Sequence, residues 1–160
     1  MATLTNSGRI AMAKAIKDLP IFMCWGEGAS EWTDTVPDEE VTATALSTVV
    51  GYRVATSVQY CTPDTGGTIS IPSGTFSTSE TETNHLYIRF EFDFADATGE
   101  TIREIGVMVN TTPNEGLPEG QGYFAVTDIA SAGDLLLLEN RKPIYRETGV
   151  KETFEFVVTF

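Results

Sequence analysis

Positive charge is scarce in this sequence. Ten Lys and Arg residues stand against 23 Asp and Glu residues, which gives a formal net charge of −13. Nucleic-acid binding depends on Lys and Arg to displace the counterions of the phosphates, and anionic membrane surfaces attract basic segments. We therefore expect neither nucleic acid nor a membrane as a partner. The acidic charge either serves solubility alone or meets a partner with a basic face.

Histidine and cysteine are also rare, with one His and two Cys in 160 residues. A general base needs an oriented partner, and His85 has none in any legible motif, so we expect it to be structural. Cys24 and Cys61 form neither a CxxC pair nor a set with the spacing of zinc ligands. We expect no catalytic residue, no cofactor, no metal site and no enzymatic activity. A buried free thiol is the simpler expectation for Cys24, with a Cys24–Cys61 disulfide as the alternative.

Long hydrophobic runs are absent. No segment approaches the roughly 20 apolar residues that a membrane-spanning helix needs. The first residues, MATLTN, have neither the basic start nor the apolar stretch of a secretory signal peptide. We therefore expect a protein that is made and kept in a cytoplasm.

The apolar residues that are present suffice for a core. Hydrophobic residues make up 41% of the chain, including nine Phe, five Tyr and two Trp. This length and composition predict one structural domain over residues 1–160. A helix is predicted over residues 7–17, where alanine-rich sequence follows the capping candidates Asn6 and Ser7. The remainder, residues 21–160, is predicted to be β-rich, with loops at about 26–41 and 110–121.

Alternating polar and apolar residues predict the strands. In the strongest segment Leu86, Ile88, Phe90, Phe92 and Phe94 point to one face, which predicts a strand with a core side and a polar side. A turn at 96–99 then leads into residues 101–109, which predicts a hairpin. Residues 153–160 alternate again, so the last strand pairs within the sheet or with a neighbouring chain. The expected fold class is α+β, mainly β: an antiparallel sheet or β-sandwich with one N-terminal helix.

Six residues are candidates for an interface with other chains. Trp32 lies in the first predicted loop, and Val157, Val158 and Phe160 lie in the last predicted strand. The adjacent pair of Arg103 and Glu104 lies between two isoleucines. Arg103 either pairs with a carboxylate that fixes strand register or forms a plain surface ion pair.

Several segments, in their order along the chain, resemble the N-terminal region of the tail-collar fibre family of tailed bacteriophages. They are LTNSG at residues 4–8, the alanine-rich helix ending at 15–16, GEG at 26–28, ALSTVVG at 45–51 and GETIREIGV at 99–107. The resemblance implies a virion structural protein without catalytic residues, attached to a baseplate. Fibre proteins continue into long shafts, whereas this chain stops at Phe160. The resemblance therefore implies an adaptor between baseplate and fibre, or another small tail or neck protein.

On this interpretation the partners are other tail, baseplate or fibre proteins. The chain is expected to be a homo-oligomer in the assembled particle, located in the virion tail after assembly in the host cytoplasm. A carbohydrate-binding β-sandwich is the alternative, with exposed Trp25, Trp32 or Tyr87 as the stacking platform. A small hydrolase has little support, because the sequence has a single His and no nucleophile motif.

Overall fold

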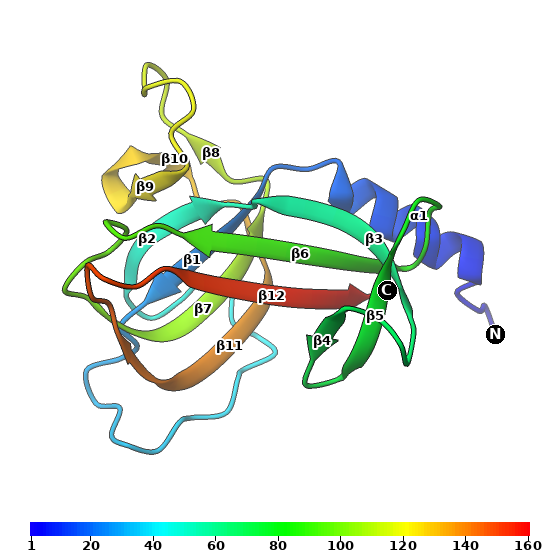
Figure 1. Ribbon diagram of the computed structural model, residues 1–160, viewed down its shortest axis with the longest axis horizontal. Coiled ribbons are helices and arrows are strands. Elements are labelled where there is room, and N and C mark those ends of the chain that lie inside the picture. Colours follow the sequence, from blue (N-terminus) through cyan, green and yellow to red (C-terminus); the bar gives the residue numbers. More distant parts are fainter. The chain divides into compact units, whose positions relative to one another are not determined.

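The computed structural model describes residues 1–160, and its chain forms one α-helix and a series of antiparallel strands (Figure 1). The expected α+β, mainly β fold class is confirmed. In chain order the elements are α1 (Asn6–Lys17), β1 (Ile21–Gly26), β2 (Val49–Val54), β3 (Ser57–Pro63), β4 (Ile69–Ile71), β5 (Gly74–Ser79), β6 (His85–Phe92), β7 (Thr101–Val109), β8 (Thr112–Pro113), β9 (Tyr123–Ala125), the 3-10 helix η1 (Val126–Asp128), β10 (Ile129–Ser131), β11 (Asp134–Tyr145) and β12 (Glu152–Thr159).

The chain divides into two compact units, and each contains one five-stranded sheet. Unit 1 comprises Met1–Leu19, Ala55–Phe90 and Thr153–Phe160, and unit 2 comprises Pro20–Val54 and Glu91–Glu152. The single domain expected from the length stays a prediction.

Unit 1 contains α1 and a sheet with the strand order β12-β6-β3-β5-β4. The helix lies where the sequence predicts it, but its N-cap is Thr5, whose hydroxyl accepts from the backbone N–H of Gly8 at 3.2 Å. The predicted caps Asn6 and Ser7 are already part of the helix. Ala13 is the fully buried residue of α1, consistent with a short helix that has one packed side.

Strand β6 buries residues on both of its faces. Leu86, Ile88, Phe90 and Phe92 are fully buried, as the alternation predicts. Tyr87, predicted to lie on the polar face, is also buried, because it packs in a cluster with Cys61, Ile69 and Phe76. Phe94 was expected on the core face but is 48% exposed, because β6 ends at Phe92.

Unit 2 contains a sheet with the strand order β11-β7-β1-β2-β9 and a two-stranded sheet of β8 and β10. All six residues of β1 are buried, as befits a strand flanked on both edges by β7 and β2. The hydrophobic core of this unit combines side chains from β1, β2, β7 and β9 with one from the β1–β2 loop: Phe22, Cys24, Leu46, Tyr52, Met108 and Phe124.

The predicted hairpin between β6 and β7 is wrong, because the two strands belong to different sheets. β7 pairs with β1 and β11, and β6 is flanked by β3 and β12. The connecting turn is held by Arg146, whose side chain donates to the carbonyl oxygens of Asp93 and Asp96 at 2.8 and 3.3 Å. The turn is therefore fixed by a distant arginine and not by local hairpin geometry.

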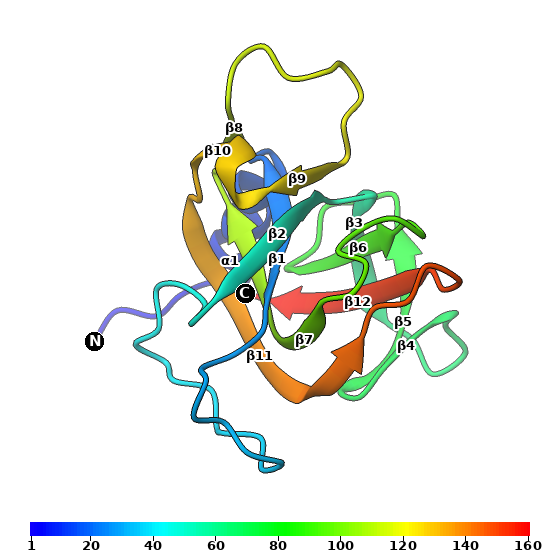
Figure 2. The same cartoon turned by 90° about the vertical axis from the view of Figure 1, so that its left-hand side faces the viewer.

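The two long loops differ in extent from the prediction. The connection after β1 runs to residue 48, because the next strand begins at Val49. The second predicted loop is interrupted by β8, which pairs with β10, so the loop proper covers residues 114–122. Figure 2 shows this loop (yellow) projecting beyond β8 and β9.

Candidate functional site

Strand β7 and the long β1–β2 connection, residues 27–48, form the first candidate site. Arg103 of β7 donates through Nη1 to the carbonyl oxygen of Trp32 at 2.9 Å and through Nη2 to that of Thr33. Its guanidinium also lies 5.6 Å from the centre of the Trp32 ring. Both expectations for Arg103 were wrong: it forms neither a carboxylate pair nor a surface ion pair, and it binds backbone carbonyls of the loop instead.

Glu104, the next residue, fixes the other end of this loop. Its side chain is buried, with 2% exposure. Its carboxylate accepts from the backbone N–H of Ser47 at 3.0 Å, from the Ser47 hydroxyl at 2.8 Å and from the N–H of Thr48 at 3.4 Å. Gly26 permits this close approach, since a Cβ there would lie 2.3 Å from the carbonyl oxygen of Thr48. Glu104 is therefore a buried anchor and not an exposed contact residue.

Asn140 of β11 is a third anchor, which the sequence analysis missed. Its side-chain amide donates to the carbonyl oxygens of Pro37 and Asp38 at 3.1 and 3.3 Å. Its backbone N–H donates to the carboxylate of Glu39 at 2.9 Å. No local pattern identifies this role, because the partners lie about a hundred residues earlier in the chain.

A cavity of about 370 Å³, open to solvent, lies between the loop and the strands β7 and β11, and Glu104 and Asn140 line it. Acidic and polar side chains of its lining are Glu31, Asp38, Glu40, Glu104 and Asn140, and apolar ones include Trp32, Leu46 and Leu138. No lysine, arginine or histidine lines it. The cavity therefore offers hydrogen-bond acceptors and negative charge without a cation.

The aromatic residues proposed for carbohydrate stacking are not free. Trp25 has no exposed surface, and its ring stacks on Phe92 with the centroids 3.7 Å apart. Tyr87 is 7% exposed and donates its hydroxyl to Glu155 at 2.5 Å. Trp32 is half-buried and packs closely over Gly28. The expectation that Trp25 and Tyr87 form an exposed platform was wrong.

The last strand, β12, is the second candidate site. Val158 is 9% exposed, Val157 packs against the Cys61 cluster, and Phe160 exchanges hydrogen bonds with Asn84 at 3.0 and 3.1 Å. Val157 and Phe160 are therefore engaged within the unit that contains β12. β12 is nevertheless the edge strand of its sheet, paired with β6 on one side and hydrogen-bonded to no strand on the other.

The outward backbone groups of β12 follow from strand alternation. The N–H of Phe160 points to β6, where it donates to Asn84. Successive residues of a strand direct their backbone groups to opposite sides. The N–H groups of Thr153, Glu155, Val157 and Thr159 therefore face the open edge and can donate to a further strand.

Burial shifts the pKa of both cysteines and of the single histidine. Cys24 and Cys61 are free and buried, and burial raises the pKa of the Cys24 thiol to about 12 and that of Cys61 to about 11. Burial also lowers the pKa of His85, whose Nδ1 lies 2.8 Å from the hydroxyl of Thr159. No group of three or more His, Cys, Asp and Glu side chains is placed to hold a metal ion. None of the helices is long and apolar enough to cross a membrane.

Comparison with known proteins supplies the biological setting for these two sites. The model of one protein family, described as baseplate wedge 3 tail fiber network component, matches residues 1–160. No curated protein sequence matches the chain. The match confirms the bacteriophage baseplate and tail-fibre character expected from the sequence. The chain therefore belongs to the family of baseplate wedge 3 tail fiber network components, structural proteins of the bacteriophage virion tail.

Proposed function

We propose that the protein is a non-catalytic adaptor that links neighbouring chains of the baseplate and tail fibres by protein–protein contacts. It acts as a homo-oligomer, binds neither nucleic acid nor a membrane, and assembles in the host cytoplasm. Membership of a family of tail fiber network components supports a place where baseplate and fibres meet. The observation that carries the proposal is the open edge of β12.

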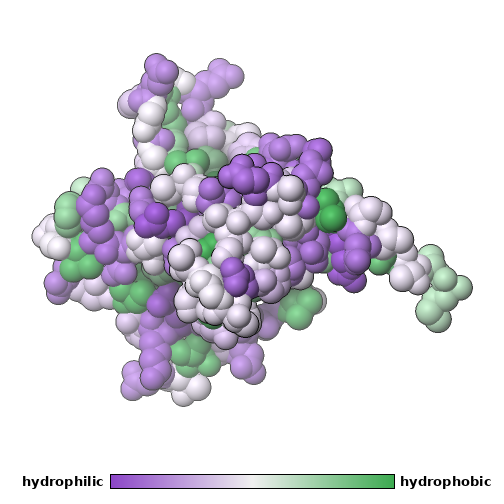
Figure 3. All heavy atoms as spheres, turned by 45° about the vertical axis from the view of Figure 1, so that its right-hand side comes forward, coloured by the Kyte–Doolittle hydropathy of each residue, from purple (hydrophilic) through white to green (hydrophobic).

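β12 contains neither lysine nor proline, two residues with which natural proteins often protect an edge strand. Its sequence is ETFEFVVT. Glu155, one of its two charged residues, accepts a hydrogen bond from the Tyr87 hydroxyl and is therefore held against its own sheet. On the face drawn in Figure 3, hydrophobic residues lie in separate patches among hydrophilic ones.

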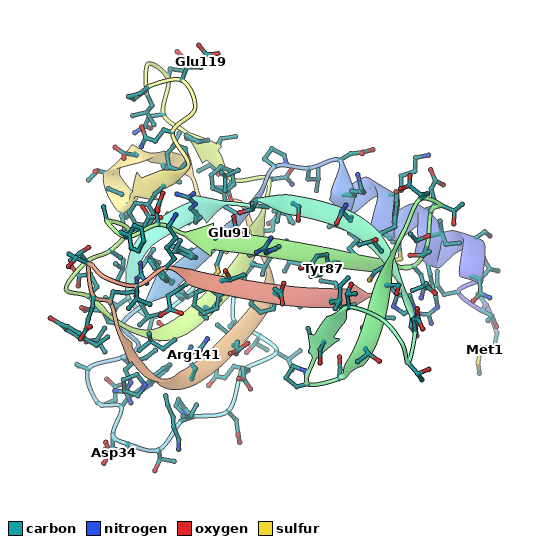
Figure 4. The ribbon with its side chains drawn as sticks, viewed as in Figure 1. Met1, Asp34, Tyr87, Glu91, Glu119 and Arg141 are labelled. Atoms are coloured by element: carbon teal, nitrogen blue, oxygen red, sulfur yellow. The ribbon has the colours of Figure 1, made fainter.

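A second copy of the chain is the partner we assign to this edge. Two β12 strands can pair antiparallel about a two-fold axis, which is the self-complementary contact of the commonest homo-oligomers. The projecting loop 114–122, with Glu119 near its tip (Figure 4), and the loop bearing Trp32 are left for contacts with other baseplate or fibre chains.

The test blocks the outer edge without disturbing the inner one. Proline has no N–H and is tolerated in edge strands where that group faces solvent. We therefore compare Thr153→Pro/Thr159→Pro with Thr153→Val/Thr159→Val, since both variants lose the two hydroxyls and only the first loses outward donors. Deletion of 157–160 is a poorer test, because it removes buried Val158 and the Phe160–Asn84 hydrogen bonds.

Light scattering behind a sizing column gives the solution mass. The wild-type and valine variants should exceed the 17.4 kDa of one chain, and the proline variant should fall to that mass. A wild-type mass of one chain at every concentration, or a proline variant with the wild-type mass, would overturn pairing through β12.

A further inference from the structure

We propose that the cavity beneath loop 27–48 receives a lysine or arginine side chain from a neighbouring baseplate or fibre chain. This inference rests on the proposed adaptor function, because it supplies the chemistry by which another protein recognises this one. It concerns a different surface from the edge of β12, so the two can fail separately.

Two side chains of the cavity carry buried acceptors that no cation of the chain meets. The Glu104 carboxylate is 2% exposed, yet its hydrogen-bond donors are the neutral groups of Ser47 and Thr48, and no cation lies beside it. The side-chain oxygen of Asn140 is buried and has no hydrogen-bond partner. Both residues line the same cavity. Buried acceptors are normally satisfied, and a buried charge is normally paired, so this cavity lacks a donor that carries positive charge.

The cavity combines exposed carboxylates with apolar surface. Asp38 and Glu40 line the cavity and are exposed, and neither forms an ion pair within the chain. Trp32, Leu46 and Leu138 supply apolar surface. Lysine and arginine carry aliphatic stems that pack on such surface while the charged head meets acceptors. The volume of about 370 Å³ lies within the range of small-ligand sites, roughly 300–1,000 Å³.

The whole of loop 27–48 is negatively charged. Residues 27–48 contain Glu27, Glu31, Asp34, Asp38, Glu39 and Glu40 and no Lys, Arg or His. A surface of one sign raises the local concentration of a partner of the opposite sign and speeds its association. The occupant that fits is thus a basic side chain presented by another protein.

Nuclear magnetic resonance titration of the ¹⁵N-labelled chain tests the inference. The probes are N-acetyl-lysine methylamide and N-acetyl-arginine methylamide, with N-acetyl-norleucine methylamide as the uncharged stem. The basic probes should shift the indole N–H of Trp32 and the side-chain amide of Asn140 saturably, and norleucine should not. Saturation by norleucine equal to that by the basic probes, or no saturable shift with any probe, would overturn the inference.

Matched charge variants separate the cavity from the general acidity of the loop. Asp38→Asn/Glu40→Gln and Glu27→Gln/Asp34→Asn each remove two loop carboxylates, but only the first pair lines the cavity. Because exposed ion pairs are individually weak, the first variant should bind the basic probes about fivefold more weakly. The second should bind them as the wild type does. Equal weakening in both variants would show a diffuse charge effect and contradict a defined site.

A calcium titration and a titration of the β12 variant serve as further controls. If calcium chloride shifts the same resonances and the basic probes do not, the cavity binds a metal ion and the inference is overturned. The Thr153→Pro/Thr159→Pro variant should bind the basic probes with wild-type affinity. Loss of self-association with retained probe binding thus tests the two surfaces independently.

Discussion

Glu104 holds the end of loop 27–48 in place. Its buried carboxylate accepts hydrogen bonds from the N–H and hydroxyl of Ser47 and from the N–H of Thr48. Arg103 secures the opposite part of the same loop through carbonyl oxygens of Trp32 and Thr33. Adjacent strand residues point to opposite faces, so two neighbours in sequence reach two separate stretches of one loop. Both residues hold the loop against β7, and Glu104 also lines the cavity.

Replacing Glu104 by alanine should lower the free energy of unfolding by about 2 kcal/mol, because hydrogen bonds to a charged group are stronger than neutral ones. Urea denaturation followed by tryptophan fluorescence measures the change. Glu139→Ala on neighbouring β11 is the control, since Glu139 is 47% exposed and forms one long ion pair with Arg141 at 3.6 Å. An equally small effect of both substitutions would contradict the anchoring role.

The buried thiols predict how stability depends on pH. The folded state raises the pKa of Cys24 to about 12 from an ordinary value of 9.0. The contribution of the protonated Cys24 thiol to stability is fully present below pH 9. It is lost as the pH rises toward the pKa of the folded state, because the unfolded chain releases the thiol proton first. In this window the free energy of unfolding should fall more steeply in the wild type than in Cys24→Ala, by up to about 1.4 kcal/mol per pH unit. Urea denaturation from pH 8 to 11 measures both profiles, and parallel profiles would contradict a buried, protonated Cys24.

At the scale of elements, the sequence predicted what is local and failed at what is not. Helix α1 and the strands β6 and β12 were predictable because their periodicity lies within a few residues. The pairing of β6 with β7 was wrong because pairing depends on which edges other strands already occupy. β11 runs from Asp134 to Tyr145, and its register against β7 shifts between Asn140 and Ile144, which no local periodicity indicates.

The same limit applies to the candidate site. Arg103 and Glu104 stood out in the sequence, but their partners lie 56 to 71 residues away, and no pattern indicated carbonyl and hydroxyl partners. Asn140 and Arg146 were missed for the same reason. Burial also decided the fate of Trp25 and Tyr87, since aromatic residues look alike in a sequence whether they are exposed or packed.

Arg146 connects two turns, and this predicts the effect of a conservative substitution. Its side chain is 1% exposed and reaches carbonyl oxygens of Asp93, Asp96 and Val150. Lysine keeps the charge but lacks the planar, forked donors, so Arg146→Lys should cost about 2 kcal/mol of the free energy of unfolding. Thermal or urea denaturation measures the loss. Arg9→Lys on α1 is the control and should be close to neutral, and a neutral Arg146→Lys would refute this account of the turns.

For the whole molecule, the negative charge and the open edge of β12 suit different contacts. A net charge of −13 makes copies repel one another, so self-pairing must come from a short-range contact such as backbone hydrogen bonds. The same charge attracts basic chains of other kinds, which fits the acceptor-rich cavity. Under the proposed function, the chain pairs with its own kind at one surface and with a basic neighbour at another.

Electron cryo-microscopy of the assembled baseplate that contains this chain tests the central claim most directly, at a resolution that separates strands. The account predicts a strand of a second copy beside the outer edge of β12, within the spacing of about 4.8 Å that hydrogen-bonded strands keep. A β12 whose outer edge faces solvent in every copy, with the contacts made elsewhere, would contradict it.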